Sequence, residues 1–416
     1  MASQLKTVPP SSTAHEEPAL AARMSRLGTE SAFEVLARAR ALEAAGRRVV
    51  HLEIGEPDFA TPVHIVDAAA AALRAGFTHY VPAPGLPEVR DAVGDYFGRT
   101  GRPRYPLERI VVTPGAKPIM FYALLALCDE GDEVLYPDPG FPMYESIARF
   151  VGATPVPIPL RERNGFRMDP EEVASLLTDR TKLLILNSPH NPCGSALTAG
   201  DLEALAGVAI EHGLYVLSDE VYFATSYNGE HHSIASVEGM RDRTILLDGA
   251  SKTFAMTGWR LGFAALPPAL VEPVTRLVIN SVSCTAAFAQ RALLAALTGP
   301  WEPVEAMVAE FRRRRDVIVE GLNRIEGVTC AEPSGAFYVF PNVSSFGVPS
   351  EEIAAFLLQE AGVAALSGAA FGREGQGYLR FSYANSVQAI REALDAISTA
   401  LPGLGARAPM ETAGRR

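Results

Sequence analysis

Short apolar segments alternate with helical stretches between residue 63 and about residue 300, and this alternation constrains the fold more than any other feature. Each apolar segment ends in turn residues or polar side chains. Such a pattern predicts an α/β unit whose largely parallel sheet is buried on both faces. The apolar segments are RIVVTPG, DEVLYPD, KLLILNSP, LYVLSDE, TILLDGAS and RLGFAALP.

The sequence on either side of this unit has a different character. Residues 30–46 predict a helix that is followed by a short strand, VVHLEIG. After about residue 300, a long charged helix precedes short strands and helices, which predicts a smaller α+β domain. The expected apolar stripe of the first helix consists of Phe33, Leu36, Ala37, Arg40 and Ala41.

Composition and charge exclude several classes of protein. Of the 416 residues, 48% are hydrophobic and 20% are charged, which is typical of a globular chain. A net charge of -11 argues against nucleic-acid binding, because that binding needs a surplus of basic residues. There is no secretory signal, no run of about 18 apolar residues and no pair of cysteines in a C-x-x-C motif. We therefore expect a cytoplasmic protein without a membrane span or a metal site.

Polar residues follow the ends of several predicted strands. Gly115, Asn191, Asp219 and Lys252 each lie within a few residues of such an end. Ligands of open α/β sheets bind outside the carboxyl ends of the strands, so these segments are expected to converge on one crevice.

The most specific local motif is GASKTFAMTGWRLG, residues 249–262. It resembles the lysine signature of the class I pyridoxal-phosphate-dependent aminotransferases, in which an arginine follows the lysine by eight positions and has small residues on both sides. Lys252 and Arg260 take these places. An aldehyde cofactor needs a primary amine to hold it, and a lysine of lowered pKa is the natural nucleophile. A lone lysine would more often lie on the surface, and it is the full spacing that favours the resemblance.

The resemblance spans residues 50–385 and implies a fold, a cofactor and a division into domains. The fold is that of the fold-type I pyridoxal-phosphate transferases, with a large domain built on a mostly parallel seven-stranded sheet covered by helices, plus a smaller α+β domain. The cofactor is pyridoxal 5'-phosphate. The expected segments are a mobile 1–22, a first part of the small domain at 23–62, the cofactor-binding domain at 63–300, the rest of the small domain at 301–402 and a mobile 403–416.

Four residues are expected to contact the cofactor's ring. An unpaired carboxylate at the end of an apolar strand is unfavourable, and the resemblance gives Asp219 the ring nitrogen as its partner, although an N-cap role would also fit this residue. Tyr222 and Asn191 match the residues that bond the phenolic oxygen. Phe141 matches an aromatic residue that stacks on the ring, while an ordinary core position is its alternative.

The cofactor's phosphate is expected to bind where TPGAK follows a strand and opens a helix, because free amides and the helix dipole attract anions there. The resemblance assigns main-chain contacts to this turn, a hydroxyl contact to Ser251, which precedes Lys252, and a bidentate contact to Arg260. For Lys117, the last residue of TPGAK, a side chain that faces solvent is the alternative to a direct role. The residues concerned are Gly115, Ala116, Lys117, Ser251 and Arg260.

The substrate's α-carboxylate is expected to meet Arg380, in GYLRFSYA, and the glycine of GEPDF, Gly55. Asn191 also lies on this side. Tyr80 matches a tyrosine that reaches the phosphate across a subunit interface, so the resemblance implies a homodimer with shared active sites. Arg276 and Arg291 match no position that binds a second carboxylate, which favours an apolar or broad amino donor over aspartate.

The expected activity is the transfer of an amino group from an L-amino acid to a 2-oxo acid by a ping-pong mechanism through a Lys252 Schiff base, with Asp219 and Tyr222 assisting. A pyridoxal-phosphate-dependent carbon-sulfur lyase, or a related elimination or cyclisation enzyme, is the alternative on the same scaffold. A ligand-sensing regulator fused to a DNA-binding module is disfavoured, because the residues before GEPDF show no helix-turn-helix pair.

Overall fold

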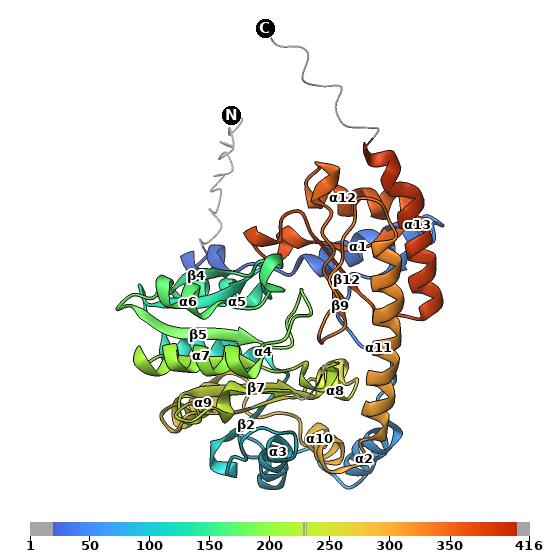
Figure 1. The fold of residues 1–416 in the computed structure, drawn as a ribbon. Coiled ribbons are helices and arrows are strands. Elements are labelled where there is room, and N and C mark those ends of the chain that lie inside the picture. The colour runs from blue at the N-terminus through green and yellow to red at the C-terminus, as the bar shows by residue number, and fades with distance from the viewer. Residues whose placement is uncertain (1–19, 228, 230, 406–416) are drawn as a thin grey trace, which may run out of the picture.

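The computed structural model describes residues 20–227, 229 and 231–405. Its largest element is a seven-stranded sheet of order β2-β8-β7-β6-β5-β3-β4 (Figure 1). β8 runs antiparallel to both of its neighbours, and all other neighbouring strands are parallel. The strands are β2 (Ile110–Thr113), β3 (Glu133–Asp138), β4 (Thr154–Pro159), β5 (Thr181–Asn187), β6 (Tyr215–Asp219), β7 (Thr244–Gly249) and β8 (Gly262–Ala265).

Helices cover both faces of this sheet. Alternate residues of β5 show the division: Leu183 and Ile185 belong to one buried cluster, and Leu184 and Leu186 belong to another on the opposite face. The predicted α/β class and the mostly parallel sheet are therefore correct. The covering helices are α2 (Val63–Arg74), α3 (Pro87–Arg99), α4 (Lys117–Leu127), α5 (Met143–Val151), α6 (Pro170–Leu176), α7 (Ala199–Glu211), α9 (Pro268–Ser281) and α10 (Ala287–Thr298), and the short α8 (Ala250–Thr253) follows β7.

The strand β4 is the one member of this sheet that the apolar segments do not predict. Its sequence, TPVPIP, has a proline at every second position and lies at the sheet's edge, where it pairs only with β3. Proline cannot donate to a ladder of hydrogen bonds, so it is tolerated mainly in edge strands. The prolines that hide this strand in the sequence are thus compatible with its place in the sheet.

A second group of elements forms the smaller α+β part. β1 (Val50–His51) pairs in parallel with β10 (Val363–Ala364), so the segment before residue 63 lies against the C-terminal part of the chain. β11 (Leu366–Ser367), β12 (Leu379–Ser382) and β9 (Tyr338–Val339) form an antiparallel sheet. The helices of this part are α1 (Ser31–Ala44), α11 (Glu302–Asn323), α12 (Ser350–Phe356) and α13 (Val387–Gly405).

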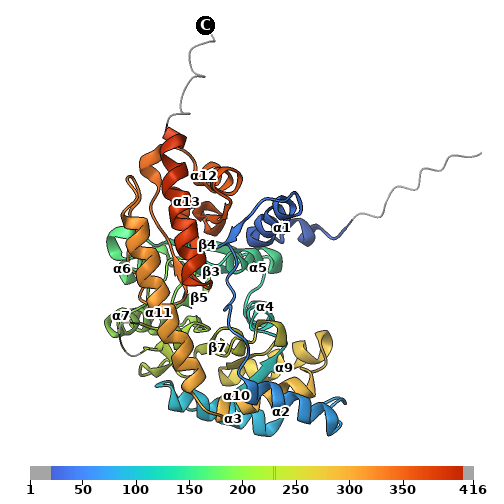
Figure 2. The same cartoon turned by 90° about the vertical axis from the view of Figure 1, so that its right-hand side faces the viewer.

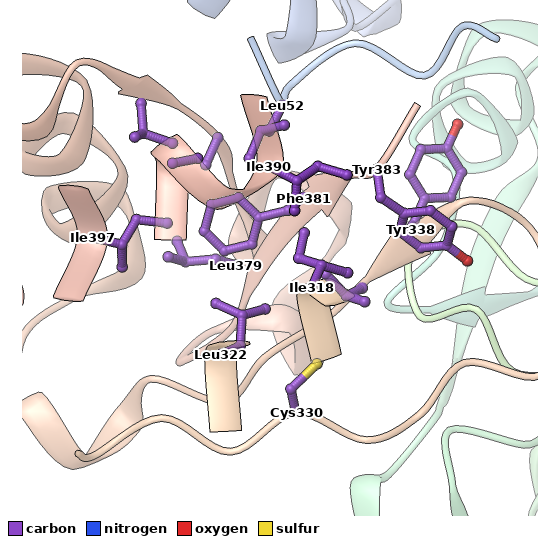
Figure 3. Packing of buried hydrophobic residues seen from close by; sticks show 14 of the residues in the cluster. Leu52, Ile318, Leu322, Cys330, Tyr338, Leu379, Phe381, Tyr383, Ile390 and Ile397 are labelled. Atoms are coloured by element: carbon purple, nitrogen blue, oxygen red, sulfur yellow. The ribbon is translucent and has the colours of Figure 1, made fainter. Parts of the chain in front are cut away.

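The core of this smaller part packs between α11, α13 and the antiparallel sheet. Figure 3 shows Ile318 and Leu322 of α11 facing Phe381 of β12, with Ile390 and Ile397 of α13 on the other side. α11 runs from this core down to the helices at the base of the large sheet (Figures 1 and 2). It therefore connects the two parts of the molecule as one continuous helix.

The stripe predicted for the first helix is wrong in detail. Ala39 is buried in α1, and Val35 and Leu42 pack beside it, whereas Phe33 is 63% exposed. The helix therefore buries a face rotated from the predicted one. The predicted mobile ends, 1–22 and 403–416, lie largely outside the described residues. No helix in the described part of the chain is long and apolar enough to cross a membrane.

Candidate active site

A cavity of about 510 Å³ lies at the carboxyl ends of the parallel strands. It is bounded by the ends of β5, β6 and β7, by the start of α4 and by residues from the smaller sheet. Eleven of the thirteen residues predicted from the sequence line it, and the structure thus brings together segments that are far apart in the chain. They are Gly55, Ala116, Lys117, Phe141, Asn191, Asp219, Tyr222, Ser251, Lys252, Arg260 and Arg380.

The Lys252 amine lies within this cavity on α8, directly after the end of β7. It donates a hydrogen bond to the carbonyl oxygen of Gly55. Burial disfavours the charged form and lowers the pKa of Lys252 from 10.5 to about 8, although Glu56 acts in the opposite direction. A useful fraction of this amine is therefore neutral, and nucleophilic, near neutral pH.

Asp219 ends β6 and is 3% exposed. Its Oδ2 accepts a hydrogen bond of 2.7 Å from the Tyr144 hydroxyl, and its Oδ1 accepts one of 3.4 Å from the Val221 amide. Among the residues that the structure describes, no cation forms an ion pair with it. Burial raises the pKa of Asp219 to about 6, and the hydrogen bond from Tyr144 only partly offsets this. The carboxylate thus lacks a positively charged partner, and it faces the cavity.

Two asparagines fix the loop after β5. Asn187 donates to the carbonyl oxygen of Asp219 at 3.0 Å and accepts from the amide of Asn191 at 2.9 Å. Asn191 in turn accepts from the Arg380 guanidinium at 3.1 Å. The side-chain amide of Asn191 is therefore held between the strand end that carries Asp219 and the arginine of the smaller sheet.

Two tyrosines meet on the same side of the cavity. The hydroxyls of Tyr222 and Tyr338 are 2.8 Å apart and share a hydrogen bond. Burial raises the pKa of Tyr222 well above 10, so the phenol stays protonated and can donate to an acceptor in the cavity. Gly55 lies directly against Tyr338, because a Cβ at this glycine would overlap the Tyr338 hydroxyl.

Arg380 projects from β12 and is 4% exposed. It donates to Asn191 and to the carbonyl oxygen of Glu53, and its Nε has no hydrogen-bond partner among the described residues. Its guanidinium lies 4.5 Å from the centre of the Tyr338 ring. Burial lowers the pKa of Arg380, although the group remains a cation. A buried cation without a carboxylate partner is a suitable anchor for the carboxylate of a ligand.

The turn before α4 forms an anion seat with Arg260. Gly115 has φ of +93°, and a Cβ there would overlap the Arg260 guanidinium. A Cβ at Gly262 would overlap the backbone of Gly115, so the turn at Gly115 and the segment from Arg260 to Gly262 meet with no room for a side chain at either glycine. The Arg260 NH1 group donates to the carbonyl oxygen of Thr257 at 2.8 Å, which holds the guanidinium beside the free amides that open α4.

Lys117 and Phe141 also line the cavity, and Lys117 is the first residue of α4, directly after Ala116. The Lys117 amine forms an ion pair with Glu30, the residue that precedes α1, and lies 5.4 Å from the centre of the Phe141 ring. Phe141 contacts the Tyr144 ring edge-on at 5.6 Å. The Lys117 side chain is thus neither free nor simply directed into solvent.

Two predicted residues do not line the cavity. Gly115 contributes by its backbone beside Arg260, as its turn requires. Tyr80 is 88% exposed and lies in the loop between α2 and α3. Its predicted role concerns a second subunit, so its position in a single chain leaves that prediction open.

Several lining residues were not predicted as site residues from the sequence, and four of them take part in the polar contacts described above. Asn187 lies in the same NSPHNP string as Asn191, and its place directly at the strand's end was a usable signal. Tyr144, Tyr338 and Glu30 reach the cavity only through tertiary contacts, and no local motif marks them. Tyr144 matters most, because it is the side chain that bonds Asp219.

The set of groups fits pyridoxal phosphate. An amine of lowered pKa suits an aldehyde, and an unpaired carboxylate suits a ring nitrogen that carries a proton. The anion seat suits a phosphate, and Phe141 offers a flat face. Among the described residues, no group of three or more histidine, cysteine or acidic side chains is placed to hold a metal ion.

Comparisons with known proteins agree with this chemistry. The profile of the family described as aminotransferase class I and II matches residues 47–397. An aspartate aminotransferase of Pyrococcus abyssi is 43% identical over 86% of this chain and 93% of its own length. The aromatic-amino-acid aminotransferase 2 of Thermococcus litoralis is 41% identical over 85% of this chain and 92% of its own length. The crystal structure of an aspartate aminotransferase from Rhizobium meliloti superimposes with a TM-score of 0.89 at 36% identity, covering 92% of this chain and 99% of that one.

Proposed function

The chain belongs to the class I and II aminotransferases and is a pyridoxal-phosphate-dependent transaminase, and we propose that Lys252 is both its covalent anchor for the cofactor and its proton carrier. One observation carries this proposal. The Lys252 amine, whose pKa is lowered to about 8, shares a cavity with a buried carboxylate and a buried guanidinium that have no ion-pair partners among the described residues. Each of these groups meets a separate need of the reaction.

Bound pyridoxal phosphate supplies an aldehyde that takes up the amino group and a ring that accepts electrons from the substrate's α-carbon. With the cofactor bound, Lys252 Nζ would hold it covalently, and as a free amine it would take up the proton of the substrate's α-carbon and give it back as the proton carrier of the reaction. Asp219 would hold a proton on the ring nitrogen of the bound cofactor. Tyr222 and Asn191 direct hydrogen-bond donors toward the ring's phenolic oxygen.

The remaining groups orient the two ligands. Arg380 holds the substrate's α-carboxylate by a bidentate pair, and Gly55 lies on the same side of the cavity. Arg260, Ser251 and the amides of Ala116 and Lys117 would hold the phosphate, and Gly115 leaves room for the Arg260 guanidinium beside them. Phe141, which lines the cavity, would stack on the ring of the bound cofactor.

A single-turnover experiment tests this proposal. Purified protein loaded with pyridoxal phosphate and mixed with an amino donor should form one equivalent of 2-oxo acid per site and release no ammonia. Addition of a second oxo acid should then form the corresponding amino acid, since the amino group stays on the protein between the two halves. Lys252→Ala should slow the first half by more than about 10³-fold, because it removes the general base and the anchor together.

Two results would contradict the proposal. Turnover of Lys252→Ala through complete cycles would exclude Lys252 as the proton carrier. Release of pyruvate and ammonia by the wild-type protein, without an oxo acid as acceptor, would instead indicate an elimination reaction on the same scaffold.

We further propose that the amino donor has an apolar or aromatic side chain, or that a broad range of donors is accepted, in preference to aspartate. The described cations that line the cavity are Lys117, Lys252, Arg260 and Arg380. Lys252, Arg260 and Arg380 have the roles given above, and Lys117 is paired with Glu30. Arg276 and Arg291 lie elsewhere and pair with Glu272 and Glu88. None of these cations is left for a distal carboxylate.

Glu30→Gln tests this proposed preference. Loss of the ion pair should free Lys117 for a second carboxylate and raise the ratio of kcat/KM for aspartate to kcat/KM for leucine about 10-fold, or about 1.4 kcal/mol. Glu34→Gln, at an exposed position in the first turn of α1, should leave the ratio unchanged. A wild-type enzyme that already favours aspartate, or a Glu30→Gln enzyme with an unchanged ratio, would refute this assignment.

We also propose that the protein is a cytoplasmic homodimer. Its four cysteines are all unpaired, which supports a reducing compartment. Exposed apolar side chains gather on α2 and the loop that follows it, which supports burial against a second copy. They are Val63, Val66, Leu73 and Tyr80, with 72%, 42%, 47% and 88% exposure.

The pairing of β1 with β10 supports the proposed small domain of residues 23–62 and 301–402 beside the large domain of 63–300.

Sedimentation velocity tests the proposed dimer. The wild-type protein should sediment at about twice the 44.5 kDa chain mass, and Leu73→Glu should shift it toward the monomer. Ile210→Glu, at a comparably exposed site on α7, is the matched control and should remain dimeric. A wild-type protein that is monomeric at micromolar concentration would contradict the dimer.

A further inference from the structure

A buried group of charged side chains lies on the far side of the strand ends from the cavity. It consists of Arg102, Glu220, His231 and Asp248, and we refer to it as the buried charge cluster. Glu220 directly follows Asp219 at the end of β6, and side chains of successive residues in an extended segment point in opposite directions. Asp219 accordingly lines the cavity, whereas Glu220 is 1% exposed and belongs to the cluster.

Glu220 is fully bonded within the cluster. Its Oε2 lies 2.8 Å from His231 Nε2, and its Oε1 accepts from the hydroxyls of Ser218 at 2.8 Å and Ser233 at 2.6 Å. The Arg102 guanidinium is 3.7 Å away. Burial acts to raise the pKa of Glu220, but His231 and Arg102 outweigh it and the pKa is lowered. Glu220 is therefore an ionised carboxylate directly beside Asp219 in the chain.

The cluster also joins the two strand ends that carry Asp219 and Lys252. Arg102 bonds Asp248 of β7 at 2.8 Å, and Asp248 accepts from the Gly249 amide at 2.6 Å, three residues before Lys252. The Glu220 amide donates to the carbonyl oxygen of Leu247 at 2.9 Å. Side-chain and main-chain bonds thus connect the ends of β6 and β7 behind the cavity.

His231 is the member of the cluster closest to the surface. Its side chain is 7% exposed, its ring contacts Phe223 edge-on at 5.9 Å, and it borders a second cavity together with Tyr96 and Arg99 of α3. The titratable and charged groups around the pair of His231 and Glu220 are Tyr96, Arg99, Arg102, Tyr105 and Asp248. His231 is thus the group through which the surface can influence Glu220.

We propose that His231 is a positioning residue for the transamination, acting through Glu220 on Asp219. Its bond to Glu220 fixes the end of β6 and helps to keep the pKa of Glu220 low, so that Asp219 is held in a defined position and electrostatic field toward the cofactor's ring nitrogen. The inference rests on the proposed role of Asp219. It extends the machinery of the reaction to a histidine that has no contact with the cavity that holds the cofactor.

A double-mutant cycle tests this role. In His231→Ala, Glu220 keeps Arg102 but loses its bond to His231, and its less compensated charge should favour protonated forms of the groups around Asp219. The pH midpoint of the bound cofactor's visible absorbance should therefore rise by about 0.5 to 1 unit. kcat should fall about 5- to 20-fold, while KM changes less than about 2-fold. In a Glu220→Gln background, the same change at His231 should move the midpoint by less than about 0.2 units, because the charge on which it acts is gone.

The neighbouring histidine is the matched control. His232 is exposed, and His232→Ala should leave the midpoint and kcat unchanged. If His231→Ala does not fold, His231→Gln replaces the imidazole with an amide that can still donate a hydrogen bond to Glu220. It should shift the midpoint in the same direction by a smaller amount.

Two outcomes would overturn the proposal. One is a midpoint unchanged by both substitutions at His231, and the other is a shift of equal size with and without Glu220. The midpoint is read on protein with bound cofactor and needs no turnover. Failure of the wild-type protein to bind pyridoxal phosphate would therefore refute the proposed function, whereas normal binding with an unmoved midpoint would refute only the role of His231.

Discussion

Burial of charged groups that have no oppositely charged partner among the described residues is the constraint on which the site depends. Burial removes water from Asp219, Lys252 and Arg380 and favours the neutral form of each group. The pKa of Asp219 is raised to about 6, that of Lys252 is lowered to about 8, and that of Arg380 is lowered. Such burial destabilises the folded chain unless a ligand supplies the missing charge. The proposed cofactor and substrate supply it, so the same feature that weakens the empty fold favours binding.

The fold tolerates these groups because rigid elements hold them from two sides. Asp219 and Lys252 follow adjacent strands of the large sheet, and Arg380 lies on a strand of the smaller one. The contact between Arg380 and Asn191 joins the two sheets across the cavity, and the bond between the Tyr222 and Tyr338 hydroxyls does the same. Behind the cavity, the buried charge cluster connects the ends of β6 and β7. Small displacements of either sheet would therefore disturb the geometry of the site.

The sequence predicts the parts of this structure that local patterns determine. Apolar runs locate six of the seven strands, and the spacing of Lys252 and Arg260 locates the anchor and the anion seat. β4 is missed because its prolines suppress the strand signal, and only the neighbouring β3 makes it an edge strand. The inward face of α1 is mispredicted because its packing partners lie more than 300 residues away, at β10. Tyr144, Tyr338 and Glu30 have no local signal at all, since their roles arise only from tertiary contacts.

The stability of cofactor-free Asp219→Asn tests the central claim most directly. The pKa of Asp219 rises from 3.8 to about 6 on folding, so its ionised form opposes folding above pH 6, and this cost vanishes below about pH 4, where both states are protonated. At pH 7.5 the variant without cofactor should be more stable than the wild type by up to about 3 kcal/mol, yet bind pyridoxal phosphate more weakly. The gain should disappear as the pH falls to 4, and Asp179→Asn on the surface should show no gain. A cofactor-free Asp219→Asn protein that is no more stable than the wild type at pH 7.5 would contradict the account.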